Sequence, residues 1–277
     1  MTRPSFVVTG ASSGIGRACV TELVRRDAHV WASVRTDADE TELARTYGDA
    51  VTVLRMDLRD PASIAACGEK VAAAGPLRGL VNNAGMARPG PLEHVPLEDF
   101  RQQLEVNVTG QLAVTQAMLP ALRAAPAARV VTVGSMGGRI AGPMVGPYHT
   151  SKFALVGLTD SLRAELAPSG IGVVLVEPGA VATSIWPRAR AAAEEVRAAL
   201  PEVARERYAA QLEEAERGAE RSARNGVPPE RAARVVVHAL TARRVAPRYL
   251  VGRDAHIAAV LANLPFRLRY RLTAAKR

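Results

Sequence analysis

The sequence predicts an α/β fold in which helices cover both faces of a parallel β-sheet. Short apolar runs rich in β-branched residues recur along the chain, and segments with a three-to-four apolar spacing separate them. Several of these runs are apolar throughout, as in strands that are buried on both faces. Regular alternation of strands and helices implies crossover connections, and these give a doubly wound parallel sheet.

The predicted strands are defined by their apolar runs and by the turn residues around them. They are Ser5–Thr9, Ala28–Val34, Val51–Met56, Gly79–Asn82, Arg129–Gly134, Gly172–Glu177 and Arg248–Val251. The segments between them carry helical spacing. Because an α/β chain of this length often forms one domain, we expect a single domain over residues 1–277 with an approximately seven-stranded sheet.

The alternation stops between Trp186 and Gly226, in a segment rich in Ala, Arg and Glu that contains no strand candidate. We therefore expect a helical insertion over residues 186–226, between the last two sheet units. A solvated helical excursion is one interpretation. A lid over a substrate pocket is favoured, because segments at the carboxyl ends of parallel strands form the binding crevice in such sheets.

Composition and targeting features indicate a cytoplasmic globular protein. Hydrophobic residues make up 48% and charged residues 23% of the chain, enough for a buried core. The first strand begins by Ser5, which leaves no room for an export signal, and no apolar run is long enough to span a membrane. Cys19 and Cys67 lack metal-ligand spacing, so we expect small buried side chains and no metal site.

The chain is basic, with a formal charge of +9 and a pI near 10.3. The basic residues are dispersed and are not interleaved with aromatic residues, so nucleic-acid binding is not predicted. A phosphorylated cofactor is compatible with this charge. The tail, residues 255–277, combines arginines with Leu261, Leu264, Phe266 and Leu268. Packing on another subunit or solvation of this tail is favoured over contact with an anionic membrane surface.

A glycine-rich turn follows the first strand directly. It consists of Gly10, Ala11, Ser12, Ser13, Gly14, Ile15 and Gly16, and a helical pattern starts at Arg17. Glycines allow a tight turn and let a pyrophosphate approach the backbone, and the free N–H groups of the helix N-terminus then face the phosphates. The turn is therefore predicted to bind a dinucleotide.

With Thr9, the run TGASSGIG resembles the cofactor-binding signature of the short-chain dehydrogenase/reductase family, and its G-x-x-x-G-x-G spacing differs from that of other dinucleotide-binding dehydrogenases. The resemblance implies a Rossmann-like fold and extends to the segments Asn82–Gly85 and Glu177–Thr183. It implies cofactor contacts at these further positions: Asp57, Leu58, Asn83, Ala84, Gly85, Pro178, Gly179, the Val181 backbone and the Thr183 hydroxyl. Taken alone, Asp57 could be a helix cap and Asn82 a turn former.

The end of the second predicted strand favours NADP(H) over NAD(H). Val34 stands where NAD-preferring relatives usually carry an aspartate, and Arg35 follows it. A carboxylate would bind the ribose 2′-hydroxyl of NAD, whereas a guanidinium suits the 2′-phosphate of NADP. The alternative is that Arg35 is an ordinary solvated arginine.

Tyr148 and Lys152 are four residues apart, which places them on one helical face. A nearby ammonium lowers the pKa of a phenol. Only Lys70, Lys152 and Lys276 are lysines in this arginine-rich chain, so a lysine at this position is informative. We expect Lys152 also to bind the cofactor, because a compact ammonium can hydrogen-bond the nicotinamide ribose hydroxyls while it stays close to the phenol. His149 is adjacent to the phenol but is expected to point elsewhere, and it is assigned no catalytic role.

The family resemblance supplies two further catalytic positions. Ser135 follows the fifth strand, where its hydroxyl would polarise a substrate carbonyl. Asn107 matches the position that in relatives is thought to hold a water between the lysine and solvent. In order and spacing, Asn107, Ser135, Tyr148 and Lys152 match the catalytic tetrad of the family.

The implied reaction is hydride transfer between the nicotinamide and a carbonyl carbon, with Tyr148 exchanging the proton on oxygen. The chain resembles the NADP-preferring branch of the family, with 17-beta-hydroxysteroid and retinol dehydrogenase-like members. Residues expected near Tyr148 are mostly apolar, and they predict a bulky hydrophobic ketone or secondary alcohol as substrate: Met136, Ile140, Met144, Val145, Ile185 and Trp186. Imine or enone reduction, a redox-neutral reaction and a non-catalytic NADP-sensing role are the alternatives. Relatives commonly form homodimers or homotetramers.

Overall fold

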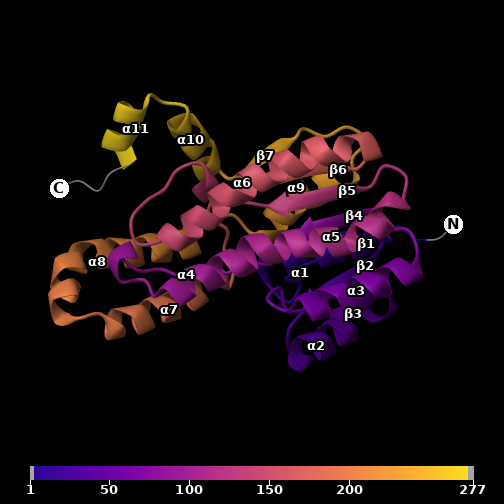
Figure 1. Ribbon diagram of the computed structural model, residues 1–277, viewed down its shortest axis with the longest axis horizontal. Helices are drawn as coiled ribbons and strands as arrows, with labels where there is room; N and C mark the ends of the chain where they lie inside the picture. Colours follow the sequence, from indigo (N-terminus) through magenta and orange to yellow (C-terminus); the bar gives the residue numbers. More distant parts are fainter. Residues whose placement is uncertain (1–2, 274–277) are drawn as a thin grey trace.

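A computed structural model describes residues 3–273 of the chain and contains one parallel sheet (Figure 1). The seven strands are β1 (Ser5–Val8), β2 (His29–Val34), β3 (Val51–Arg55), β4 (Gly79–Asn82), β5 (Arg129–Val133), β6 (Gly172–Pro178) and β7 (Arg248–Val251). Their order across the sheet is β3-β2-β1-β4-β5-β6-β7. The predicted doubly wound sheet is confirmed, and each strand boundary lies within one residue of the predicted one.

The order of the strands reverses between β1 and β4, which are direct neighbours with Val7 opposite Leu80. The connections from β1 proceed outward to β2 and β3, and those from β4 proceed outward in the opposite direction. A crevice forms at the carboxyl ends of the strands at such a switch point. The glycine-rich turn after β1 and the polar segment after β4 both start there.

Helices cover the sheet on both faces (Figure 1). One face is covered by α1 (Gly14–Val24), α2 (Asp37–Tyr47) and α9 (Pro229–Thr241), and the other by α3 (Pro61–Ala74), α5 (Gly110–Arg123) and α6 (Gly146–Leu166). Val7 belongs to one apolar core and its neighbour Val8 to the other, because successive side chains of a strand point to opposite faces. Cys19 and Cys67 are free and buried, one in each core.

Between β4 and β5, residues 97–123 form one continuous helical rod. It comprises α4 (Leu97–Leu104), a π-helical turn, η3 (Glu105–Thr109), and α5. The short 3-10 helices are η1 (Gly48–Ala50), η2 (Leu92–His94), η4 (Met136–Gly138) and η5 (Ala167–Ser169).

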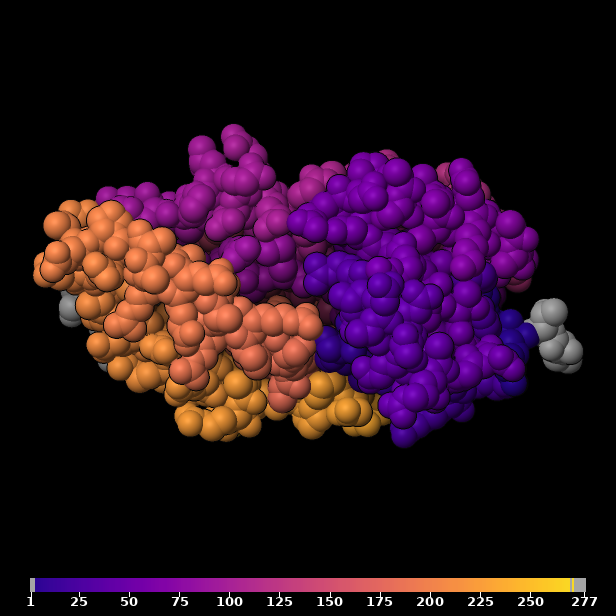
Figure 2. All heavy atoms as spheres, turned by 90° about the horizontal axis from the view of Figure 1, so that it is seen from below, coloured from indigo at the N-terminus to yellow at the C-terminus, as the bar shows by residue number. Residues whose placement is uncertain are grey.

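The predicted insertion consists of two helices, α7 (Ile185–Ala199) and α8 (Glu202–Asn225), which lie at one end of the molecule (Figure 1). In Figure 2 this segment and the N-terminal part of the chain meet along a recess. The Arg207 guanidinium of α8 pairs with Glu93 of η2 at 3.1 Å, so the insertion contacts the loop before α4.

The C-terminal part of the chain forms α10 (Arg253–Ala262) and α11 (Phe266–Thr273). The tail expected from residue 255 therefore begins inside a helix, and this helix buries Ala255 and Ala258. Residues 274–277 of that tail lie outside the described part of the chain. Within residues 3–273, no helix is both long enough and apolar enough to cross a membrane.

Candidate active site

The glycine-rich turn connects β1 to α1, and three of its glycines are required by geometry. Gly10 and Gly14 have positive φ values of 65° and 56°. A Cβ on Gly16 would lie 2.2 Å from the Gly10 carbonyl oxygen. Ser13, the N-cap residue of α1, makes no side-chain cap hydrogen bond. The first-turn N–H groups are thus left available to an anionic group beside a glycine-lined surface.

Thr9 ties this turn to the segment that follows β4. Its hydroxyl accepts hydrogen bonds from the backbone N–H groups of Asn83 and Ala84, at 2.9 and 3.0 Å, and donates to the Val81 carbonyl at 3.2 Å. The Asn83 side-chain amide donates to the Thr9 carbonyl at 2.9 Å. The structure thus brings together the TGASSGIG and NNAG segments. The sequence did not indicate that the Thr9 hydroxyl links them by hydrogen bonds.

Asn82 and Gly85 are the first and last residues of the NNAG segment, and both are held by contacts with other elements. Asn82 is buried at the end of β4 and donates to the Thr115 hydroxyl at 2.8 Å, so it is a strand residue and not a turn former. A Cβ on Gly85 would lie 3.2 Å from the Asn107 Oδ1 atom. The NNAG segment therefore lies against the element that carries Asn107.

Arg35 and Asp57 both lie after strands at the edge of the sheet expected to hold adenosine. Arg35 is exposed and has no hydrogen bond or ion pair with another described residue. Asp57 pairs with Arg59 at 2.6 Å. The hydrogen bond from Arg59 is the main reason that the pKa of the Asp57 carboxyl is lowered, and Arg35 contributes through its charge.

The helix-cap alternative for Asp57 is wrong. The residue that caps α3 is Asp60, whose carboxylate accepts from the Ala62 N–H at 3.0 Å. Leu58 is buried, and its carbonyl oxygen would lie 2.4 Å from a Cβ on Gly110, so the start of α5 packs closely against it. The side chains of Ser12, Ser13 and Ile15 are partly exposed on the turn after β1.

Tyr148 and Lys152 lie in the first two turns of α6, with the Lys152 Nζ atom 5.7 Å from the centre of the Tyr148 ring. Lys152 is buried, and its ammonium donates to the Val133 carbonyl at the end of β5 at 3.0 Å. Ser135 hydrogen-bonds the Tyr148 side chain, and its Oγ atom also accepts from the Gly137 N–H at 3.0 Å. The three predicted residues are therefore assembled at the carboxyl end of β5.

The direction of the Tyr148 pKa differs from the expectation. Burial raises the pKa of the phenol above its usual range, and the hydrogen bond with Ser135 opposes this only in part. Burial also lowers the pKa of Lys152 to about 8. The reason is that desolvation disfavours the charged form of both groups, an effect that residue spacing does not reveal.

Asn107 lies within the π-helical turn and is fully buried. Its side chain accepts from the Met86 N–H at 2.8 Å and donates to the Met86 carbonyl and to the Ser151 hydroxyl, both at 3.0 Å. Ser151 directly precedes Lys152. Asn107 therefore connects the segment after β4 to the helix that carries the phenol and the ammonium. Single π-helical turns within helices often occur at functional sites.

Two side chains hold the loop that follows Ser135. His149 contacts the carbonyl of Gly137 through Nδ1 at 2.9 Å and accepts from the Gly142 N–H through Nε2 at 3.1 Å, so its neutral form carries the proton on Nδ1. Burial lowers the pKa of His149. Arg139 makes two hydrogen bonds of 2.8 and 2.6 Å to the fully buried Glu177. The sequence did not indicate these positioning contacts.

The turn after β6 is held by its own backbone N–H groups. Gly179 donates to the Val251 carbonyl at 2.8 Å, Ala180 to the Asp254 carboxylate at 2.5 Å and Ala182 to the Val227 carbonyl at 3.0 Å. Between Gly179 and Ala182, the Val181 N–H alone has no partner among the described residues.

The residues around this turn bring it against the glycine-rich turn. The Thr183 side chain would lie 3.0 Å from a Cβ on Gly14, and the hydroxyl of Ser184 donates to that of Ser13 at 3.0 Å. Pro178 is the last residue of β6 and is paired with β7. The segments after β1 and β6 are therefore in direct contact at the carboxyl edge of the sheet, where we expect the cofactor cleft.

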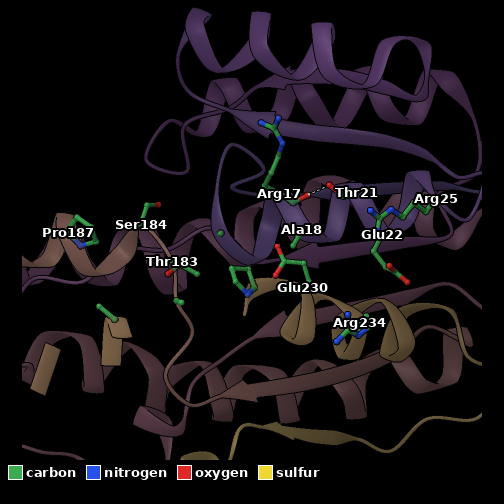
Figure 3. Close-up of a pocket in the computed structure, with 14 residues that line it drawn as sticks. Arg17, Ala18, Thr21, Glu22, Arg25, Thr183, Ser184, Pro187, Glu230 and Arg234 are labelled. Carbon is green, nitrogen blue, oxygen red and sulfur yellow. Dashed lines mark hydrogen bonds between the residues drawn. The ribbon is translucent and has the colours of Figure 1, made fainter. Parts of the chain in front are cut away.

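A cavity of about 720 Å³ opens next to the contact between these two turns (Figure 3). It is lined by Gly14, Thr183 and Ser184 together with residues of α1 and the start of α9, and the labelled Arg17 and Glu230 come from these two helices. Tyr148 does not line it. This cavity therefore adjoins the predicted phosphate-binding turn and is not the predicted substrate pocket.

Of the residues predicted for a substrate pocket, four lie in the segment between β5 and α6, and Ile185 and Trp186 lie at the start of α7. Met144 is buried and has a positive φ of 66°, while Met136, Ile140, Val145, Ile185 and Trp186 are partly buried. The Met144 carbonyl accepts from the Gly90 N–H, and Val196 of α7 would lie 3.1 Å from a Cβ on Gly90. The first insertion helix thus packs close to the segment that leads to Tyr148.

The lowered pKa of Lys152 predicts an alkaline loss of activity. We expect kcat/KM for the reduced cofactor to fall as the pH rises through about 8, because the free protein loses its buried ammonium there. For the same reason, the charged lysine costs folding stability below pH 8, and that cost disappears as the pH rises toward the ordinary lysine pKa.

A pH profile of the Lys152→Arg variant is the control, since arginine stays protonated over this range. Its activity is expected to be lower overall but to lack the decline near pH 8. A decline near pH 8 that persists in Lys152→Arg would contradict the assignment to Lys152.

Comparison with known proteins places these features in a family. The family model described as short chain dehydrogenase matches residues 5–194. The NADPH-dependent 3-dehydrocapnine reductase of Ornithobacterium rhinotracheale is 41% identical over 191 residues, covering 66% of this chain and 68% of that protein. Human 17-beta-hydroxysteroid dehydrogenase type 1 is 36% identical over 205 residues, covering 71% of this chain and 62% of the human one.

Solved structures resemble the whole chain. A short chain dehydrogenase from Burkholderia cenocepacia in complex with NADP has a TM-score of 0.75 and 27% identity, covering 98% of this chain and 97% of the other. A short chain dehydrogenase/reductase from Burkholderia phymatum in complex with NAD has a TM-score of 0.80 and 25% identity, covering 99% and 96%. Structural neighbours with either cofactor are thus found.

Proposed function

The chain belongs to the short-chain dehydrogenase/reductase family. Within this family, we propose that it catalyses the NADP(H)-dependent reduction of a bulky hydrophobic ketone, or the oxidation of the corresponding secondary alcohol. It is an NAD(P)-dependent oxidoreductase that acts on alcohol or ketone groups. The observation that carries the proposal is the assembly of Tyr148, Lys152 and Ser135 at the carboxyl end of β5, next to a cleft with dinucleotide-binding geometry.

The residues of this cleft fit a nicotinamide dinucleotide. Gly16 lets α1 start directly against the Gly10 carbonyl, and no side chain caps the N-terminus of this helix, so its first-turn N–H groups can receive a pyrophosphate. In the turn after β6, the Val181 N–H is a hydrogen-bond donor without a partner in the described chain, as a site for the nicotinamide carboxamide requires. When bound, the cofactor supplies or accepts the hydride.

We assign proton transfer to Tyr148. The surrounding groups position the phenol and the substrate oxygen. The raised pKa keeps the phenol protonated at neutral pH, so it can donate its proton to the oxygen of a ketone. The Ser135 hydroxyl holds that oxygen next to the phenol. The Lys152 ammonium then stabilises the phenolate, and the chain of Ser151 and Asn107 hydrogen bonds keeps this part of α6 in position.

Preference for NADP(H) is supported by two residues at the end of β2. Val34 removes the carboxylate that would bind a ribose 2′-hydroxyl, and Arg35 is exposed without an ion-pair partner among the described residues. Asp57, on which Arg35 acts through its charge, is already paired with Arg59, so it competes weakly for Arg35. The name of the 41% identical relative as NADPH-dependent is consistent with this preference.

A bulky hydrophobic substrate is supported by the surroundings of Tyr148. Met144 is buried, and Val196 of the first insertion helix lies close to Gly90, which is bridged to Val145. Met144 and Val145 lie on the segment that leads to Tyr148, and such apolar surroundings would favour a large apolar ligand there.

The proposal is tested by following NADPH absorbance with a panel of bulky hydrophobic ketones, small polar ketones, cyclic imines and enones. We expect NADPH oxidation with the bulky ketones and slower oxidation when NADH replaces NADPH. Turnover of imines or enones in place of ketones would overturn the substrate class. Tight NADPH binding without turnover of any substrate would favour a sensing role.

We also propose that the insertion, α7 and α8, acts as a lid that Glu93 helps to hold closed. The Tyr208 hydroxyl of α8 donates to Glu93 at 2.6 Å, next to the ion pair with Arg207. We expect Glu93→Gln to raise KM for the ketone about two- to fivefold with little change in kcat, because these contacts are exposed and individually weak.

The matched control for this lid is Glu213→Gln on α8. Within residues 3–273, Glu213 pairs only inside its own helix, with Arg217 at 3.5 Å, so its replacement leaves the closing contact intact. Steady-state kinetics of the two variants would exclude a closing role for Glu93 if both show the same KM as the unmodified protein, or the same increase.

A further inference from the structure

A carboxylate from the C-terminal part of the chain holds the turn after β6. Asp254 lies in the first turn of α10, and its Oδ2 atom accepts the Ala180 N–H at 2.5 Å across 74 residues of sequence. Its Oδ1 atom accepts the N–H of Ala255 at 3.0 Å. The family match covers residues 5–194 and does not include Asp254. A residue outside the matched segment therefore fixes a turn at the expected cofactor cleft.

Gly179 and Asp254 fit each other sterically. A Cβ on Gly179 would lie 1.9 Å from Oδ1 and 2.2 Å from Oδ2 of the Asp254 carboxylate. Gly179 does not have a positive φ, so its backbone conformation is open to any residue. Glycine is required here because the carboxylate approaches the turn so closely.

The anchoring of Ala180 also determines where the next N–H points. The Ala180 carbonyl accepts from the Val227 N–H at 2.9 Å, and the peptide plane between Ala180 and Val181 is thereby held. The Val181 carbonyl accepts from the Trp186 indole at 2.7 Å. With these neighbours fixed, the Val181 N–H is left as a preoriented donor.

We propose that Asp254 is a positioning residue for the nicotinamide end of the cofactor, acting through the Ala180 N–H on the orientation of the Val181 N–H. This inference rests on the proposed function. The ionised carboxylate suits this place because two N–H groups converge on it at the N-terminus of α10, where a negative charge is favoured. An asparagine at this position would offer one acceptor oxygen and direct its own N–H groups toward the other donor.

The test compares two ligands by isothermal titration calorimetry. NADP⁺ contacts both ends of the cleft, whereas adenosine 2′,5′-bisphosphate contains the adenosine and the 2′-phosphate but no nicotinamide. For Asp254→Asn we expect about a tenfold weaker affinity for NADP⁺, since a charge-assisted hydrogen bond is lost, and an unchanged affinity for the bisphosphate. Arg253→Ala, at the exposed neighbouring position on α10, is the matched control and should change neither affinity.

Gly179→Ala tests the same contact from the other side. Its methyl group displaces the Asp254 carboxylate, so we expect the same selective loss of NADP⁺ affinity. Combined with Asp254→Ala, which removes the carboxylate, the glycine replacement should add little further loss, because the two changes affect one contact. This pair of variants gives an answer even where Asp254→Asn folds poorly.

The outcomes separate the inference from the function it rests on. If the unmodified protein binds neither ligand, the proposed function fails. If it binds both and Asp254→Asn leaves NADP⁺ affinity unchanged, the positioning role is wrong. An equal loss for NADP⁺ and the bisphosphate would also overturn it, since a general structural role would weaken both ends of the cleft.

Discussion

Replacement of Tyr148 by phenylalanine is expected to lower kcat by about 10³-fold, within the range attributed to general acid–base catalysis. The phenol hydroxyl is hydrogen-bonded to Ser135 and lies beside the Lys152 ammonium, so its loss removes the proton donor at the centre of the site. The ring itself stays, and the packing of the first turns of α6 is preserved. NADPH affinity, measured by cofactor fluorescence, should therefore remain within about twofold of that of the unmodified protein.

Tyr249→Phe is the matched control for this variant. Tyr249 lies in β7, an element that carries none of the four catalytic candidates, and its hydroxyl accepts from the Ala246 N–H at 2.9 Å. Its loss should leave kcat unchanged. If Tyr148→Phe keeps kcat within tenfold of the unmodified value, another group transfers the proton, and the assignment of the phenol is wrong.

Replacement of Arg35 by alanine is expected to weaken NADPH binding by about 10- to 100-fold and to leave NADH binding almost unchanged. This range corresponds to the loss of hydrogen bonds between a guanidinium and a phosphate dianion. Arg35 is exposed and has no ion-pair partner among the described residues, so no compensating contact is released when it is removed. The difference between the cofactors should diminish at high salt because the site is solvated.

Arg45→Ala controls for the change in net charge. Arg45 is an exposed arginine of α2, the helix that follows Arg35, and its removal lowers the charge by the same amount. Dissociation constants for NADPH and NADH are measured for both variants. An unchanged ratio of the two constants in Arg35→Ala would show that NADP selectivity has another origin.

The sequence predicted the sheet well because its strands are buried on both faces. A strand such as β5, Arg129–Val133, must be apolar on each side, so its sequence is distinctive even without neighbours. The order of the motifs also predicted which side chains meet, because the carboxyl ends of parallel strands share one edge. Ser135, Tyr148 and Lys152 are assembled in the structure for this reason.

The contacts that hold the site could not be predicted in the same way. Asp254 reaches Ala180 across 74 residues, and no local pattern marks such a pair. Helix capping by Asp60 instead of Asp57 depends on where the chain turns after β3. The raised pKa of Tyr148 depends on burial, which is set by the whole fold and outweighs the opposing hydrogen bond with Ser135.

The π-helical turn at Asn107 also acts as a phase shift within a continuous rod. Hydrogen bonds from residue i to i+5 accommodate one residue more than an α-helical turn does, so side chains after the turn are rotated about the helix axis relative to those before it. As a result α4 packs on α6, whereas α5 packs on α3. The rod therefore packs against two different helices. Asn107 lies in the π-helical turn, and its side chain is turned inward, where it hydrogen-bonds Met86 and Ser151.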